Sequence, residues 1–236
     1  MVWVVLLGLL AAALAATDNV DTEWIKTWAP LIAGAAGLTV VICIASIALA
    51  IVLAVLGALG RLSTNPFING LASLYVSLVR GTPLIVQIYF IYFALPSLGI
   101  ILPALPAGIF ALGFNYGAYL TEIFRAGIQA VPAGQREAGS ALGMPDRLVM
   151  LRVVLPQATR IVTPAIGNEF IAMIKDSALV SIIGVREVLW NAETAGRPRN
   201  NTIEAFIIAA LIYWVLTIIF SLFQERLERR MARSDR

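Results

Sequence analysis

Histidine is absent from this chain of 236 residues, and cysteine occurs only once, as Cys43. Without histidine the chain lacks the commonest general base and metal ligand, so it can form neither a Ser-His dyad nor a His-Glu-x-x-His zinc motif. A single cysteine excludes an intrachain disulfide and a cysteine metal cluster. Charged residues make up only 13% of the chain, against roughly a quarter in soluble domains. These absences argue against most classes of soluble enzyme.

The chain is rich in apolar residues. Hydrophobic residues make up 60% of the chain, and its mean hydropathy is +0.88. No charged residue occurs in 27–60, 81–121 or 205–223. Because about 20 consecutive apolar residues cross a bilayer as a helix, the pattern predicts an all-α membrane protein with one embedded domain.

Five core spans are expected, at about 29–58, 83–100, 106–126, 158–185 and 203–225. The second and third share the longest uncharged run, and its prolines and glycine at 95–106 supply the turn between them. Before the second span, residues 65–80 carry apolar side chains at helical spacing. This spacing predicts an amphipathic helix on the inner membrane surface.

The two ends of the chain differ from this core. Residues 1–16 are apolar, and two alternatives stay open for them: a short extra span or uncleaved signal, or a cleaved signal peptide that lacks the usual basic start. Residues 17–28 are expected to form an acidic linker on the outer side. Residues 227–236 are expected to form a basic cytoplasmic tail.

The distribution of arginine sets the orientation. If the tail "RLERRMARSDR" is cytoplasmic, alternation of the spans places most of the other arginines, Arg80 among them, on the same side. This agrees with the excess of basic residues in cytoplasmic loops. The pI of about 9.3 is therefore explained by orientation in the bilayer and not by a nucleic-acid partner.

A polar hairpin of about 131–158, "VPAGQREAGSALGMPDRLVMLRVVLPQA", interrupts the apolar runs on the cytoplasmic side. Pro132 can begin a short helix that ends at Gly143. Asp146 starts a second helix, and Leu155-Pro156 turns the chain back towards the membrane. The residues alone allow two interpretations, a compact docking knob or a solvated loop.

Within this hairpin, "EAGSALGMPDRLVMLRVVLP" resembles the EAA motif of ABC importer permeases. Gly139 replaces the second alanine of that motif and Val153 replaces an isoleucine. The flanking segments "RGTPLIVQIYFIYFALP" and "NEFIAMIKDSALVSIIGVREVL" resemble the subfamily for polar amino acids, and the resemblance covers about 29–226. The residues that match the motif in register are Glu137, Ala138, Gly143, Leu155 and Pro156.

The resemblance implies the five-span fold of a type I importer permease in a bacterial cytoplasmic (inner) membrane. It implies a second permease subunit, self or related, an ATP-binding subunit that holds ATP and magnesium, and an external solute-binding protein that delivers an amino acid. The short helix would be the coupling helix that docks on the ATPase, through Glu137, Ala138, Gly139, Ala141, Leu142 and Gly143.

The sequence itself agrees that ATP binds elsewhere. Neither of its two lysines, Lys26 and Lys175, follows the glycine-rich turn of a phosphate-binding loop. We therefore expect no cofactor in this chain and no enzymatic activity of its own.

Polar residues inside spans are costly and usually functional. An amino-acid zwitterion needs hydrogen-bond donors for its carboxylate and acceptors for its ammonium group. The candidates for such substrate contacts are Gln87, Asn115, Asn168 and Glu169. The alternative for each of them is a hydrogen bond between helices.

A second set of polar residues is expected to act as gates or to stabilise the structure. Glu122 and Arg125 lie near the inner surface and can form an ion pair at i, i+3. The set comprises Arg80, Glu122, Arg125, Lys175 and Asp176.

Other functions compete with that of an ABC permease. An ion-coupled secondary transporter would need ion sites at Glu169, Asp176 or Glu122, and it often has an inverted repeat, which this chain lacks. An intramembrane aspartyl enzyme would need a pair of aspartates, but only Asp176 lies in a span. An ABC permease for another small solute remains open.

Overall fold

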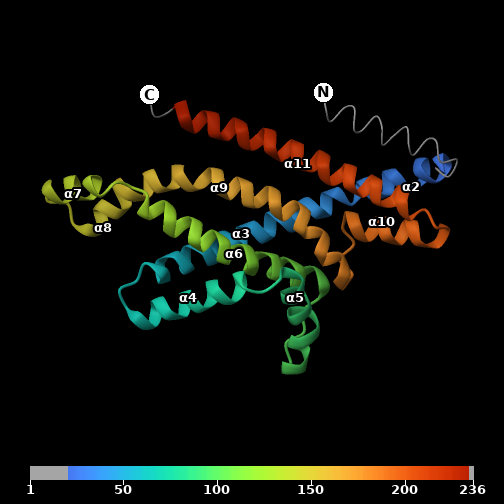
Figure 1. Ribbon diagram of the computed structural model, residues 1–236, viewed down its shortest axis with the longest axis horizontal. Coiled ribbons are helices and arrows are strands. Elements are labelled where there is room, and N and C mark those ends of the chain that lie inside the picture. Colours follow the sequence, from blue (N-terminus) through green and yellow to red (C-terminus); the bar gives the residue numbers. More distant parts are fainter. Residues whose placement is uncertain (1–20, 234–236) are drawn as a thin grey trace.

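The computed structural model describes residues 21–233, and the segment 1–16 expected to be a span or signal lies outside them (Figure 1). All regular elements in the described range are helical, which confirms the predicted all-α class. The longer helices are α2 (Thr22–Gly34), α3 (Ala36–Arg61), α4 (Pro66–Arg80), α6 (Ala104–Gln129), α9 (Leu155–Asp176), α10 (Val188–Gly196) and α11 (Thr202–Arg233).

Shorter helical pieces join these elements. After α4 the chain continues through α5 (Leu84–Tyr89), a π-helical turn η1 (Phe90–Ala94) and a 3-10 turn η2 (Leu95–Leu98). The hairpin contains α7 (Ala133–Ala141), α8 (Asp146–Val149) and a π-helical turn η3 (Met150–Val154). A 3-10 helix η4 (Ser177–Ile183) extends α9, and η5 (Arg197–Arg199) follows α10.

The first expected span and its linker are longer and more helical than the sequence indicated. The Asp21 side chain accepts a hydrogen bond from the backbone N–H of Trp24 at 2.9 Å, and such a cap starts a helix. The acidic segment 17–28 is therefore helical from Thr22 onwards. Helices α2 and α3 together run from Thr22 to Arg61 with only a turn at Ala35 between them.

Helix α6 lies at the centre of the bundle and packs against α3, α4, α5 and α9. Close approach to α3 depends on small residues, because a Cβ added to Gly57 would lie 2.2 Å from Thr121 Oγ1. The core at this crossing is built from buried apolar residues of α3 and α6, including Ile42, Ala50, Ala54, Ala111, Leu112 and Leu120.

Length and composition identify two described helical stretches as membrane spans, Thr22–Arg61 and Thr202–Met231, and a third if α4 and the α5–η2 segment count as one span bent by 106°. Helices α6 and α9 also stand where spans were predicted and have 26 and 22 residues. They are more polar because they face other helices and a cavity instead of lipid alone.

Helix α4 differs from the prediction of a helix lying on the inner surface. It packs along α3 and α6, with its polar face inwards: Asn69 Nδ2 donates to the Arg61 carbonyl at 2.7 Å, and Tyr75 donates to the Phe114 carbonyl at 2.8 Å. Its apolar face is exposed, as at Phe67. An amphipathic helix can satisfy the same pattern with its apolar side towards lipid and its polar side towards the bundle.

Different elements lie at the two ends of the bundle. Helices α7 and α8 and the C-terminal end of α11 point towards one end, whereas α2 and α10 lie at the other (Figure 1). Hairpin and basic tail are therefore on the same side, as predicted. The tail is helical as far as Arg233. The opposite end has its own small core, in which Trp24, Ile32 and Val188 are buried.

Candidate functional site

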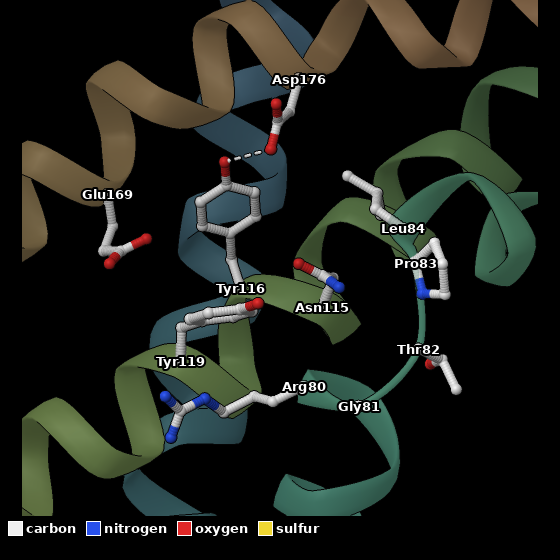
Figure 2. A pocket seen from close by; sticks show the side chains of 10 residues that line it. All are labelled: Arg80, Gly81, Thr82, Pro83, Leu84, Asn115, Tyr116, Tyr119, Glu169 and Asp176. Atoms are coloured by element: carbon white, nitrogen blue, oxygen red, sulfur yellow. Dashed lines mark hydrogen bonds between the residues drawn. The ribbon is translucent and has the colours of Figure 1, made fainter.

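A cavity of about 480 Å³ opens where the bend between α4 and α5 faces the middle of α6 and the second half of α9 (Figure 2). Polar groups within a membrane-spanning bundle usually serve its function. The lining residues are Arg80, Gly81, Thr82, Pro83, Leu84, Asn115, Tyr116, Tyr119, Glu169 and Asp176.

The bend itself is built by the sequence Arg-Gly-Thr-Pro. A Cβ on Gly81 would lie 2.8 Å from the Ser77 carbonyl oxygen, so the tight turn requires glycine. Pro83 then precedes α5 in an extended conformation, which ends one helix and starts the next. Gln87 fixes the turn, because its amide donates to the Val79 carbonyl at 2.8 Å and to Thr82 Oγ1 at 2.9 Å.

Charges of both signs face this cavity from different helices. The Arg80 guanidinium lies over the ring of Tyr119, 5.1 Å from its centroid, in a cation–π arrangement. Asp176 accepts a hydrogen bond from the Tyr116 hydroxyl at 2.8 Å. Figure 2 shows Asp176 and Glu169 on α9, with the two tyrosines between Asp176 and Arg80.

The four predicted substrate contacts occupy different places. Asn115 and Glu169 line the cavity. Gln87 lies behind the lining, where its Oε1 accepts from Asn115 Nδ2 at 3.2 Å, so it positions Asn115. Asn168 points to the other side of α9 and accepts from Gln224 Nε2 at 3.0 Å. The structure therefore brings two of the four directly to the cavity and a third to its supporting wall.

The residues predicted to be gates or structural groups also lie in different places. Arg80 and Asp176 line the cavity, and Arg80 is an exposed residue at the end of α4 where the chain bends into α5. Lys175 is exposed and forms no hydrogen bond or ion pair within the described residues. Its neighbour Asp176 lines the cavity and Lys175 does not, because adjacent residues on a helix point in directions about 100° apart.

Glu122 and Arg125 form the expected ion pair, with Arg125 Nη2 2.7 Å from Glu122 Oε2. The sequence did not indicate that Arg61 joins them, with its Nε 3.0 Å from Glu122 Oε1. Arg61 also donates to the Ser73 hydroxyl. One carboxylate therefore links the inner ends of α3 and α6, and Arg61 extends the link to α4.

Tyr116 is a further site residue that the sequence did not single out. It is only 3% exposed and stands one position beyond Asn115, off the polar stripe of α6. Its partner Asp176 is 60 positions away in the chain. A signal that could have identified it is a tyrosine in a span, since a buried hydroxyl needs a hydrogen-bond partner.

The polar hairpin is the second candidate site, and it has a core of its own. Val131, Val149, Val154 and Ala158 are buried together. Arg136 Nη2 donates to the Ile128 carbonyl at 2.8 Å and ties α7 to the end of α6. The hairpin is therefore a compact body attached to α6 and α9, which excludes the solvated-loop alternative.

The predicted coupling residues divide between the inside and the outside of this hairpin. Glu137, Ala138 and Ala141 are exposed, and Leu142 is 82% exposed. The other two residues have structural positions: Gly139 is buried, and a Cβ there would lie 3.0 Å from Val149 Cγ2, while Gly143 has φ +74°.

Residues 46–233 match the family model of the binding-protein-dependent transport system inner membrane component. The chain is 40% identical over 219 residues to the arginine transport system permease protein ArtQ of Bacillus subtilis (strain 168), covering 92% of this chain and 100% of that protein. It is 39% identical over 205 residues to the L-cystine transport system permease protein TcyB of the same organism, covering 86% and 88%.

Two solved structures share the fold. The crystal structure of an amino acid ABC transporter with histidines matches with a TM-score of 0.85 and 39% identity, over 90% of this chain and 99% of that chain. The MetNI methionine ABC transporter, in an inward-facing conformation, matches with a TM-score of 0.67 at 19% identity, over 84% and 92%, and this likeness shows the fold alone.

These matches confirm the resemblance that the hairpin and its flanking segments indicated. A permease subunit of this kind is a multi-pass protein of the cytoplasmic membrane without a catalytic site of its own, and a separate ATPase subunit hydrolyses the ATP. The chain belongs to the family of binding-protein-dependent transport system inner membrane components, the permease subunits of ABC importers.

Proposed function

We propose that this chain, paired with a second permease subunit, passes a polar or charged amino acid into the cell by alternating access, and that the cavity beside Arg80 holds the amino acid. The observation that carries the proposal is the placement of one guanidinium and two carboxylates, Glu169 and Asp176, around the same cavity. A guanidinium binds a carboxylate through paired hydrogen bonds, and the two carboxylates can accept from an ammonium group. The arginine and cystine permeases among the relatives support this substrate class.

The balance of charge in the cavity favours substrates with an additional positive charge. Once Arg80 binds the α-carboxylate and one carboxylate binds the α-ammonium, the other carboxylate remains for a cationic side chain. Asp176 already accepts from Tyr116, whereas Glu169 has no hydrogen bond within the described residues. Cationic amino acids should therefore compete better than acidic ones.

The energy would come from the cytoplasmic side through the hairpin. We propose that Glu137, Ala138, Ala141 and Leu142 contact an ATPase subunit that holds ATP and magnesium, with Leu142 as a protruding apolar anchor. Closure of the ATPase would then move α7 as a rigid body, and α6 and α9 would move with it. On the opposite side, around α10, a solute-binding protein would deliver the substrate.

The experiment is ATP-driven uptake by the complete complex in proteoliposomes, with Glu169→Gln as the variant. Loss of a hydrogen bond to a charged group costs about 1.5–3 kcal/mol, so the KM for a cationic amino acid should rise by roughly tenfold or more. The matched control is Asn168→Ala, one position earlier but on the other face of α9, which should keep the wild-type KM. An unchanged substrate profile for Glu169→Gln would retire the proposed role of this residue.

A further inference from the structure

A second hollow of about 310 Å³ lies on the far side of α9 from the substrate cavity. It is a groove between α3, α9 and α11. Its walls are apolar side chains from all three helices: Ile47 and Ile51 of α3, Phe170 of α9, and Phe220, Phe223 and Leu227 of α11.

Thr163, Gln224 and Glu228 are the polar side chains in the lining, and the Oε1 atom of Gln224 is buried without a hydrogen-bond partner among the described residues. Gln224 Nε2 donates to the Pro164 carbonyl at 3.1 Å and to Glu228 Oε1 at 2.9 Å. Apart from these three side chains, the residues that line the groove are apolar or glycine. Such a wall fits a hydrocarbon chain better than it fits a polar solute.

Two arginines stand beside the cytoplasmic end of this groove. Arg226 is next to Leu227 on α11, and Arg230 follows Leu227 by less than one helical turn. Both are exposed, and neither forms an ion pair with any carboxylate of the described residues. Arg229 differs from them, because its Nη2 lies 3.0 Å from Glu225 Oε2. The positive charges of Arg226 and Arg230 thus remain uncompensated.

The groove also opens where lipid is available. Only 11% of the most apolar stretch of α11 is buried within this chain, so most of this stretch is open to lipid or to a second subunit. Its arginine-rich end lies on the cytoplasmic side, where anionic lipids attract basic residues next to a span.

We propose that this groove binds an anionic phospholipid of the cytoplasmic leaflet, with an acyl chain between α3, α9 and α11 and the phosphate at Arg226 and Arg230. The apolar wall accounts for the chain, and the unpaired arginines account for the charge of the headgroup. Because α9 also carries Glu169 and continues from the hairpin, a lipid in this groove contacts the helix that joins the ATPase-docking end to the substrate cavity. Occupancy of the groove should therefore support coupled transport.

The test uses the complete transport complex, purified in a mild detergent with phosphatidylglycerol present. Native mass spectrometry counts the phosphatidylglycerol that stays bound. The double variant Arg226→Gln/Arg230→Gln should retain roughly tenfold less than the wild type, because each arginine attracts anionic lipid. The control Arg229→Gln removes a charge from the same stretch of α11 that is already paired, and it should retain the wild-type amount.

A second variant, Ile51→Phe, narrows the groove without touching the arginines. It should also lower retention, which separates binding in the groove from attraction to the helix surface. Equal retention by Arg226→Gln/Arg230→Gln and wild type would overturn the proposal, as would cross-linking of Phe223→Cys to the second permease subunit, which would make the groove a protein interface. Retention is measured without transport, so its outcome does not depend on the substrate proposed above.

Discussion

Glu122 forms ion pairs with two arginines near one end of the bundle. Its carboxylate pairs with Arg61 of α3 and with Arg125 of α6, at 3.0 and 2.7 Å, and its side chain is only 19% exposed. Ion pairs that are partly shielded from water are worth more than those on the surface. This residue therefore fastens two helices at the point where α6 leads into the hairpin.

We predict that Glu122→Gln lowers the stability of the protein by about 1–3 kcal/mol, since two guanidinium groups lose their charged partner. The measurement is the thermal unfolding midpoint in detergent. Glu225→Gln is the control, because its pair with Arg229 is exposed and should contribute about 0–1 kcal/mol. Equal midpoints for the two variants would contradict this role.

At the scale of elements, the crossing of α6 and α9 depends on Gly127. A Cβ at this position would lie 2.2 Å from Val162 Cγ1, so Gly127→Ala must push the helices apart. Overpacking of this kind costs about 1–3 kcal/mol, and Val162→Ala in the same chain should restore much of the loss. The readout is again thermal unfolding. Gly70→Ala, in a helical position where the added Cβ meets open space, should cause no loss; a loss as large as that of Gly127→Ala would refute the packing argument.

The hairpin provides a second test at this scale. Gly143 ends α7 in the left-handed region, at φ +74°, and the Met144 N–H donates to the Gly139 carbonyl at 3.1 Å. This is the helix end that glycine favours. A bulky residue in this conformation destabilises the fold by roughly 1–2 kcal/mol. It should also distort the surface of α7 that is proposed to dock on the ATPase.

We predict that Gly143→Val inserts in the membrane normally but loses most ATPase binding and uptake. Asparagine tolerates this backbone conformation better, so Gly143→Asn should keep more of both. Copurification of the ATPase and ATP-driven uptake are the measurements. Wild-type uptake by Gly143→Val would count strongly against a coupling role for the hairpin.

At the scale of the whole molecule, much of the fold could be predicted from the sequence. Apolar runs placed helical segments at the five expected positions, since a bilayer leaves few other structures open to an apolar chain. The segment expected as one span at 83–100 is instead broken into α5, η1 and η2, and α9 ends at Asp176 before the 3-10 helix η4. The helix start and stop signals of the hairpin, Pro132, Gly143 and Asp146, match the ends of α7 and the start of α8. These signals are short stretches of neighbouring residues, so they can be read from a single sequence.

The remaining features depend on contacts between distant segments. The pattern of residues 65–80 fits two placements equally well: a helix on the membrane surface, and a helix in the bundle with its apolar face towards lipid. The position of Arg80 could therefore not be predicted. Asn168 and Glu169 are adjacent, and helical spacing alone cannot decide which of them faces a cavity. The hydrogen bond between Tyr116 and Asp176 joins α6 and α9, and no sequence motif predicts that these two helices pack together.

The central claim is that a separate ATPase drives this permease to import an amino acid. The most direct measurement is uptake of labelled arginine into proteoliposomes that contain the chain with its ATPase, second permease subunit and solute-binding protein. The account predicts uptake that requires ATP hydrolysis and stops when the ATPase is omitted. Uptake by the permease without the ATPase, driven by an ion gradient, would contradict it and would favour a secondary transporter.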